Sequence, residues 1–196
     1  MAVVWLIRHA ATDENLRYQM IGMTDVSLGT TGMEQAKALA QRIKSVKFEA
    51  IYTSPLARAT ETATQIAAKN QHRPLIHPQD GLKELHLGTF EGSSSFQAYE
   101  QFQSIMDKAL DSSTDDFAFP GGEWRSAAVR RFNGALCKIV LHHPDGHICV
   151  VTHGAVIGLW LSFLHNVPLG RFRDYQPQHA AITTVLAESP HTQFRL

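Results

Sequence analysis

Val3-Val4-Trp5-Leu6-Ile7 is an unbroken run of β-branched, aromatic and aliphatic residues, and it ends abruptly at Arg8-His9-Ala10. A short apolar run without polar alternation is typical of a strand buried on both faces of a parallel sheet. In open α/β sheets, ligands bind beyond the carboxyl ends of the strands, where the connecting loops begin. An arginine and a histidine at this point are therefore placed for chemistry, with a fixed positive charge beside a nucleophilic imidazole.

A second apolar run repeats this arrangement towards the other end of the chain. His147-Ile148-Cys149-Val150-Val151-Thr152 is predicted to form a strand, and His153-Gly154 follows it directly. Because the carboxyl ends of parallel strands meet at one edge of a sheet, we expect His9 and His153 to share one site.

Strand and helix patterns alternate along the rest of the chain. Further strands are expected at 50–53, 75–77 and 181–186, and helices from a capping box at Thr31–Glu34, from Ser54-Pro55 to about Lys69, over 127–140 and over 155–164. Residues 89–123, rich in Ser, Gln, Asp and aromatic residues, interrupt the alternation, and we expect them to form a lid-like insertion. The pattern predicts one α/β domain over residues 1–196, a three-layer α/β/α sandwich with a mostly parallel central sheet.

Charge and composition argue against several classes of partner. Lys plus Arg and Asp plus Glu both total 18, so no net field favours nucleic acid or an anionic membrane. The N-terminus shows no signal-peptide pattern, and the apolar stretch 155–164 is far shorter than the roughly 20 residues that span a bilayer. The chain has only two cysteines, which favours a reducing compartment. We expect a cytoplasmic protein that binds neither nucleic acid nor membrane, and the sequence leaves its oligomeric state open.

Two further charged residues are candidates for the same site. Arg58 falls in the first turn of the helix that begins at Pro55, and a cation beside the unpaired N–H groups of a helix N-terminus favours an anion. Glu84 belongs to Glu84-Leu85-His86-Leu87-Gly88-Thr89-Phe90-Glu91-Gly92, whose two glycines indicate a tight backbone path. Such a site needs a proton donor, and Glu84 is the candidate.

Six blocks of residues, in their order along the chain, resemble the histidine phosphatase superfamily in its phosphoglycerate mutase-like branch. They are Leu6-Ile7-Arg8-His9 with Thr12 and Asn15; Gly22-Met23-Thr24-Asp25 with Leu28 and Gly32; Thr53-Ser54-Pro55-Leu56 with Arg58-Ala59 and Thr62-Ala63; Glu84-Leu85 with Gly88 and Glu91-Gly92; Pro120-Gly121-Gly122-Glu123; and Val151-Thr152-His153-Gly154. A single Arg-His pair would carry no weight, but six ordered blocks over nearly the whole chain make the resemblance specific.

The resemblance implies a phosphatase that acts on a small phosphorylated metabolite and needs neither a metal nor a cofactor. His9 would attack phosphorus to give a phosphohistidine that water then hydrolyses, and Glu84 would protonate the leaving alcohol. The resemblance assigns the phosphoryl group to Arg8, Asn15, Arg58, His153 and Gly154.

Several positions depart from the family pattern or have no assigned role. Ala10 stands where the family usually has glycine, and we expect a modest adjustment of the backbone there. Trp124 follows Pro120-Gly121-Gly122-Glu123 where relatives often carry serine, and it either packs over the site or belongs to the core. His86 and His179 lie in segments that approach the site in relatives, and the sequence assigns them no role.

The predicted lid bears on the choice of reaction, because a phosphoglycerate mutase shares the residues above. A mutase must retain a doubly phosphorylated or carboxylated intermediate, which calls for extra cations, yet Lys108 is the only basic residue between Ser93 and Pro120. Hydrolysis is therefore favoured over mutase activity. A non-catalytic phosphate-binding protein is disfavoured for a different reason, because all the catalytic positions that the resemblance implies are filled. The substrate stays open among sugar phosphates, nucleoside-type monophosphates such as α-ribazole phosphate, and phosphoglycerates. Six aromatic residues either line its pocket or form the lid's own core: Phe96, Tyr99, Phe102, Phe117, Phe119 and Trp124.

Overall fold

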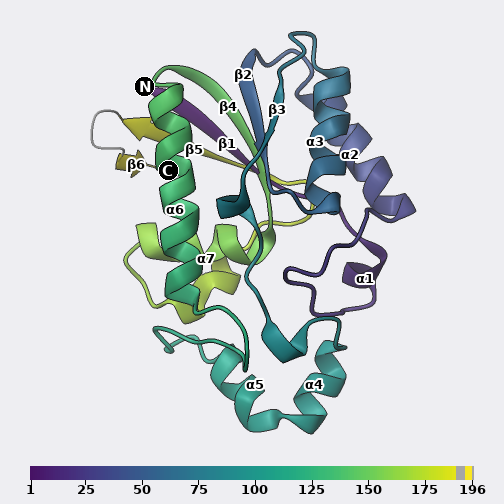
Figure 1. Cartoon of the computed structure of the whole chain (residues 1–196), viewed down its shortest axis with the longest axis vertical. Helices are drawn as coiled ribbons and strands as arrows, with labels where there is room; N and C mark the ends of the chain where they lie inside the picture. Colours follow the sequence, from purple (N-terminus) through teal and green to yellow (C-terminus); the bar gives the residue numbers. More distant parts are fainter. Residues whose placement is uncertain (189–192, 196) are drawn as a thin grey trace.

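The computed structural model describes residues 1–188 and 193–195, and its strands form one sheet in the order β3-β2-β4-β1-β5-β6. The strands are β1 (Ala2–Arg8), β2 (Phe48–Thr53), β3 (Ile76–Pro78), β4 (Gly146–Thr152), β5 (Ile182–Glu188) and β6 (Gln193–Arg195). The first four run parallel, whereas β5 and β6 form an antiparallel edge beside β1 (Figure 1). The predicted sandwich with a mostly parallel sheet is confirmed.

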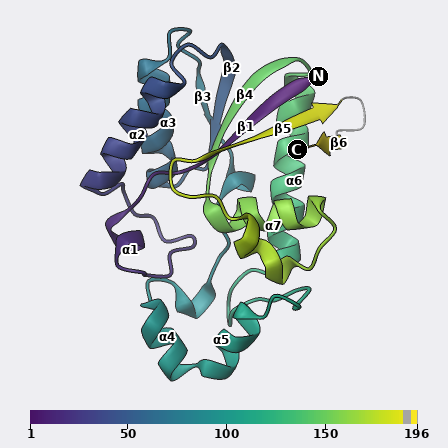
Figure 2. The same cartoon turned by 180° about the vertical axis from the view of Figure 1, so that it is seen from behind.

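Helices cover both faces of this sheet. The α-helices are α1 (Asp13–Leu16), α2 (Thr30–Arg42), α3 (Ala57–Lys69), α4 (Ser95–Gln101), α5 (Gln103–Leu110), α6 (Arg125–His142) and α7 (Gly154–Leu164), and the 3-10 helices are η1 (Asp80–Leu82), η2 (Gly88–Phe90) and η3 (Leu169–Tyr175). Helices α2 and α3 pack on one face and α6 and α7 on the other (Figures 1 and 2). In the described ranges, no helix combines the length and the apolar character needed to cross a membrane.

Alternate residues of the central strands supply the two cores. Val4, Leu6 and Val150 pack against α6 and α7, while Ile7 and Val151 pack against α2 and α3. Since successive strand residues point to opposite faces, a strand with both faces covered has to be apolar throughout. This explains why the two apolar runs lack polar alternation.

The register of the parallel strands brings the two predicted histidines together. Strand β1 pairs with β4 so that Arg8 lies opposite Thr152, and the residues that follow are His9 and His153. The amide of His9 donates to the carbonyl of Thr152 at 2.8 Å, which continues the pairing one residue beyond the strands.

Residues 89–123, which we call the lid segment, contain α4 and α5 and lie beyond the carboxyl ends of the parallel strands (Figures 1 and 2). Their own small core consists of Phe90, Ala98, Met106, Ala109 and Phe119. The lid segment therefore packs partly on itself, next to the edge of the sheet at which the site forms.

Two helix starts differ from the sequence prediction. Thr31 is the second residue of α2, whose N-cap is Gly29 without a side-chain hydrogen bond, and the capping box is instead at Thr12 and Asn15 of α1. Helix α3 begins at Ala57 rather than Pro55, because the backbone of Leu56 is extended and Leu56 is the N-cap. The Ser54 hydroxyl accepts from the Leu56 amide and also bonds to His153. Arg58 still lies in the first turn of α3.

Candidate active site

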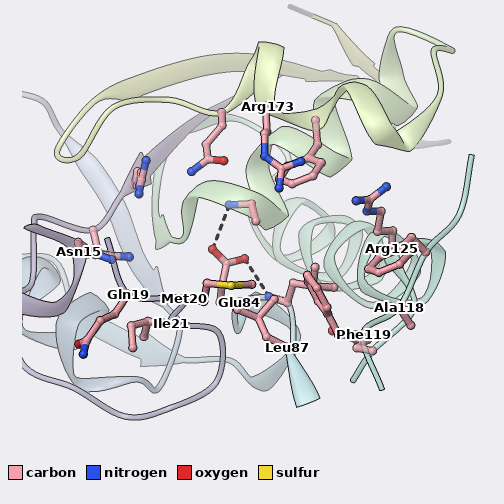
Figure 3. A pocket seen from close by; sticks show the side chains of 18 residues that line it. Asn15, Gln19, Met20, Ile21, Glu84, Leu87, Ala118, Phe119, Arg125 and Arg173 are labelled. Carbon is pink, nitrogen blue, oxygen red and sulfur yellow. Dashed lines mark hydrogen bonds between the residues drawn. The ribbon is translucent and has the colours of Figure 1, made fainter. Parts of the chain in front are cut away.

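A cavity of about 240 Å³ opens at the carboxyl ends of the parallel strands, beside the lid segment. The predicted residues among its walls are Arg8, His9, Asn15 and Glu84. Figure 3 shows Asn15 and Arg125 on opposite sides of the pocket, with Glu84 between them. Arg58, His153 and Gly154 are buried close to these residues and do not form part of the cavity wall. The structure thus brings the predicted residues into one region, in two layers.

The His9 side chain is buried at the bottom of the site, and its two ring nitrogens differ. Nδ1 lies 2.7 Å from the carbonyl oxygen of Ala10, and since a carbonyl only accepts, Nδ1 carries the proton. The lone pair of Nε2 is then available for attack. Burial, followed by the positive charge of Arg58, lowers the pKa of His9 well below its usual value of 6.5. The imidazole is therefore neutral near pH 7, as a nucleophile has to be.

Arg8 is held by the chain segment that follows η3. Its Nη1 donates to the carbonyl oxygen of Pro177 and its Nη2 to Nε2 of His179, both at 2.8 Å. Because a guanidinium only donates, Nε2 of His179 accepts and the ring is neutral. Burial, and then the charge of Arg8, lowers the pKa of His179 to about 4, which keeps it in this form at neutral pH. The structure thus shows that His179, which had no role assigned from the sequence, is a partner of Arg8.

His153 is fully buried, with its ring centroid 5.0 Å from that of His9. Its Nε2 lies 2.7 Å from the hydroxyl oxygen of Ser54, which also accepts from the amide of Leu56 at 3.3 Å. A hydroxyl that accepts from Leu56 can donate its own proton to Nε2, which places the ring proton on Nδ1. Nδ1 has no hydrogen-bond partner among the described residues. This Nδ1–H is therefore a buried donor that the described part of the protein leaves unused.

The guanidinium of Arg58 donates hydrogen bonds to a loop that the carboxylate of Glu91 holds in place. Its Nη1 donates to the carbonyl of Thr24 at 2.8 Å and its Nη2 to that of Gly22 at 2.6 Å. Glu91 accepts from the amides of Gly22, Thr24 and Leu87 at 2.9–3.1 Å, and also from the Thr24 hydroxyl at 2.7 Å. Glu91 therefore holds the loop whose carbonyls fix the guanidinium of Arg58.

Glu84 lies at the N-terminus of α7 with its carboxyl group on the pocket wall. It accepts hydrogen bonds from the amides of Leu85, Ala155 and Val156 at 2.8–3.0 Å. Figure 3 shows the bonds from Leu85 and Ala155, which also line the pocket. The first amides of a helix lack partners within it, so Glu84 supplies acceptors for two of them. These bonds fix the carboxyl group beside the cavity.

Three small features complete the predicted set. The Oδ1 atom of Asn15 accepts from the amide of Thr12 at 3.2 Å, which leaves the side-chain NH₂ as the group it can offer to a ligand. A Cβ on Gly154 would lie 2.8 Å from Cζ of Arg8, so this position needs glycine for the close approach of the guanidinium. Ala10 is not among the described residues with positive φ, and its Cβ therefore causes no backbone strain.

Two cations on the pocket wall were not anticipated from the sequence. Arg125 is the first residue of α6 and Arg173 lies in η3, so neither belongs to the segment between Ser93 and Pro120 in which only Lys108 is basic. The scarcity of basic residues in the lid segment therefore does not leave the pocket without further cations, because other segments supply two. Both arginines are single residues in otherwise unremarkable positions, and only the tertiary structure brings them together.

Two of the six aromatic residues meet both alternatives, and the other four are exposed. Phe117 and Phe119 line the cavity and also belong to the lid segment's core, whereas Phe96, Tyr99 and Phe102 are exposed. Trp124 is 57% exposed and does not line the cavity, so it neither packs over the site nor belongs to the core.

His86 does not line the cavity. Its backbone carbonyl oxygen accepts a hydrogen bond from the amide of Glu123 at 3.0 Å. Within the described ranges, no group of three or more His, Cys, Asp or Glu side chains could hold a metal ion.

Comparison with families of known proteins gives a match over residues 4–196 to the model described as histidine phosphatase superfamily (branch 1). A relative from Bacillus subtilis named "Uncharacterized phosphatase PhoE" is 31% identical over 162 residues, which is 83% of this chain and 77% of the relative. A "Metal-independent phosphoserine phosphatase" of Arabidopsis thaliana is 34% identical over 154 residues, 78% of this chain and 64% of that protein.

Solved structures share the fold. Bacillus stearothermophilus YhfR superimposes with a TM-score of 0.87 and 25% identity, covering 100% of this chain and 95% of that chain. A mycobacterial glucosyl-3-phosphoglycerate phosphatase, solved with VO3, gives a TM-score of 0.86 at 24% identity, with 98% of this chain and 96% of that chain covered. The likeness extends over essentially the whole length of each molecule.

Proposed function

The chain belongs to the histidine phosphatase superfamily, and from that premise we propose that it is a metal-independent phosphomonoesterase that works through a phosphohistidine. The observation that carries the proposal is the state of His9. This imidazole is neutral, with its Nδ1 proton bound to the carbonyl of Ala10, and it lies in the same cavity as Arg8 and Glu84. The substrate is a small phosphorylated metabolite that fits the cavity.

In the first step, Nε2 of His9 attacks phosphorus and the bond between phosphorus and the ester oxygen breaks. Arg8, Arg58 and Nδ1–H of His153 bind the phosphoryl oxygens, together with the NH₂ group of Asn15 and the N–H of Gly154. Donors that are already fixed by the protein stabilise the charge of the transition state without reorganisation. Arg8 is such a donor, because its hydrogen bonds to Pro177 and His179 fix its guanidinium before a ligand binds.

Proton transfer is the role of Glu84. The leaving oxygen takes a proton from the Glu84 carboxyl group, and the product alcohol departs. Water then attacks the phosphohistidine, gives a proton back to Glu84, and breaks the P–N bond to release inorganic phosphate. Both steps use the same carboxyl group, which its three amide contacts hold at the pocket wall.

The names of the relatives support this reading at two points. The relative from Bacillus subtilis is named as a phosphatase, and the Arabidopsis relative as a metal-independent phosphoserine phosphatase. Arginines take the charge-stabilising part that a metal ion has in other phosphoryl-transfer enzymes. We therefore expect turnover to survive a chelator.

The test is steady-state hydrolysis of a panel of phosphomonoesters, with EDTA present, by the wild type, His9→Ala and the control His72→Ala, whose residue is exposed. We expect the wild type and the control to release phosphate at the same rate and His9→Ala to release none above background. Turnover that requires a divalent metal would refute metal independence. Conversion of 3-phosphoglycerate without net release of phosphate would identify a mutase, and ligand binding without any turnover would identify a phosphate-binding protein.

A further inference from the structure

The cavity continues past Glu84 to a wall that the phosphoryl site does not use. Arg125 and Arg173 lie on that wall, across the pocket from Asn15 (Figure 3). Between these ends, Leu87, Phe119 and other apolar side chains complete the lining. A ligand whose phosphoryl group is held at His9 would therefore extend its remaining atoms towards two guanidinium groups.

Arg125 is a buried cation without a counterion. It is 2% exposed, and its Nη2 donates to the carbonyl oxygen of Ala109 at 2.6 Å. Its Nε and Nη1 have no hydrogen-bond partner in the described part of the chain. The guanidinium lies against the rings of Phe117 and Phe172, 5.1 and 5.2 Å from their centroids. Burial of an unpaired charge is costly, and an apolar side chain of similar length would fill this space at less cost.

Arg173 brings a second positive charge to the same place. Its Nη1 donates to the same carbonyl oxygen of Ala109 at 3.1 Å, and its Cζ lies 4.5 Å from the centroid of Phe172. Two guanidinium groups thus share one acceptor and one ring. Burial, and next the positive charge of Arg173, lowers the pKa of Arg125 to about 10. This direction agrees with electrostatic repulsion between the two guanidinium groups.

The neighbouring acidic groups are engaged elsewhere. The pocket carboxylate Glu123 forms a two-point ion pair with Arg131 at 2.7 and 2.8 Å. Asp111 and Asp116 accept hydrogen bonds from nearby amides and hydroxyls. Among the described residues, no ion pair is formed by Arg125 or Arg173, whereas the adjacent Arg171 pairs with Asp174.

We propose that Arg125 and Arg173 form a second anion subsite, so that the substrate of the proposed phosphatase reaction carries another acidic group besides the phosphoryl group that is removed. That group is a carboxylate or a second phosphate. The exposed Arg173 contacts it directly, and Arg125 adds the charge behind it. An anion here relieves the repulsion between the two guanidinium groups and uses the planar donor geometry that suits carboxylate and phosphate alike.

The inference rests on the proposed function for its chemistry, and matched ester pairs test it. O-Phosphoserine and O-phosphoethanolamine differ by one carboxylate, and 3-phosphoglycerate has a carboxylate where glycerol 3-phosphate has a hydroxymethyl group. Glucose 1,6-bisphosphate against glucose 6-phosphate tests a second phosphate. We expect the acidic member of at least one pair to have a kcat/KM about tenfold or more above its partner, the range typical of one hydrogen-bonded charge pair.

Two variants and a control assign the preference to these residues. Arg173→Gln and Arg125→Met, which keeps an apolar stem between the two rings, should each lower the acidic-to-neutral ratio by about tenfold. Arg171→Gln removes a charge from the same 3-10 helix, at a position that does not line the pocket, and should keep the ratio of the wild type. If Arg125→Met does not fold, Arg173→Gln alone decides the question.

Failure of the subsite and failure of the proposed function give different results. Hydrolysis of p-nitrophenyl phosphate that depends on His9, with an acidic-to-neutral ratio near one for every pair, would overturn the subsite and leave the phosphatase proposal intact. If no ester is hydrolysed, titration calorimetry with the same ester pairs replaces the kinetics. Tighter binding of the acidic ester that Arg173→Gln abolishes would support the subsite, and equal binding of both esters would overturn it.

Discussion

Nη2 of Arg8 lies 2.8 Å from Nε2 of His179, so a neutral histidine accepts a hydrogen bond from the arginine that flanks the nucleophile. The ring of His179 also lies 5.6 Å from that of His9, measured between centroids. The guanidinium of Arg8 is therefore oriented by a residue about 170 positions further along the sequence.

Replacement of His179 tests this orientation. His179→Leu leaves a largely buried N–H of Arg8 without an acceptor, and we expect kcat/KM to fall by about ten- to a hundredfold. His179→Gln provides an amide oxygen that can accept, and we expect it to restore most of the loss. Steady-state kinetics and inhibition by inorganic phosphate report the effect, and equal activity of the Leu and Gln variants would refute a role through the hydrogen bond.

Glu84→Gln separates proton transfer from positioning. With an alkyl phosphomonoester the leaving oxygen needs a proton, and we expect kcat to fall by about 10²- to 10⁴-fold. With p-nitrophenyl phosphate the leaving group departs as a stable anion, so formation of the phosphohistidine should be nearly as fast as in the wild type. A pre-steady-state burst of p-nitrophenol measures that step. Equal loss of the first step with both esters would show that Glu84 only positions the site.

Gly154→Ala tests the close approach of α7 to Arg8. The added methyl group would lie 2.8 Å from Cζ and Nε of Arg8, which has to move, and we expect a loss of about tenfold or more in kcat/KM. Gly134→Ala is the matched control, because a Cβ there meets nothing within 4 Å in the middle of α6. The control should keep full activity and stabilise the protein by up to about 1 kcal/mol. Full activity of Gly154→Ala would contradict the proposed position of Arg8 during catalysis.

Buried neutral imidazoles make the fold sensitive to acid. The pKa values of His9 and His153 are lowered well below 6.5 and that of His179 to about 4, in each case mainly by burial. Above pH 6.5 both folded and unfolded states are unprotonated at these rings, and stability is unaffected. Below it the unfolded state binds protons that the folded state does not, so the free energy of unfolding falls as the pH decreases towards about 4.

Each protected imidazole contributes a slope of about 1.4 kcal/mol per pH unit within that interval. Urea unfolding at a series of pH values between 7.5 and 4.5 measures the slope, and His179→Gln should reduce it, whereas His72→Gln at an exposed position should not. A slope that is the same in the wild type and in His179→Gln would contradict the assigned protonation state.

Patterns in the sequence predicted those features that residues adjacent in the chain determine, such as the buried strands and the residues at their ends. The two apolar runs gave β1 and β4, and their ends gave His9 and His153, because a strand covered on both faces has a simple signature. The capping box at Thr31 and Glu34 was wrong because the Thr-x-x-Glu spacing also occurs inside a helix, where its hydroxyl has no free amide to accept from.

Long-range contacts could not be predicted in this way. His179 and Arg173 lie in irregular or 3-10 segments, and Arg125 at a helix start, so no periodicity distinguishes them from surface residues. Their places are set by the packing of the segment after α7 against β1 and the lid segment. The antiparallel direction of β5 has the same origin, since a strand's own sequence does not encode the direction of its neighbour.

Direct observation of the phosphorylated enzyme tests the central claim, that His9 is the nucleophile. Glu84→Gln is mixed with ³²P-labelled p-nitrophenyl phosphate and quenched in alkali, in which phosphohistidine survives, and the labelled peptide is then mapped by mass spectrometry. We predict one alkali-stable, acid-labile phosphoryl group on His9, absent when His9→Ala is combined with Glu84→Gln. Label on any other residue, or release of phosphate by the wild type with no labelled enzyme at any time point, would contradict the mechanism.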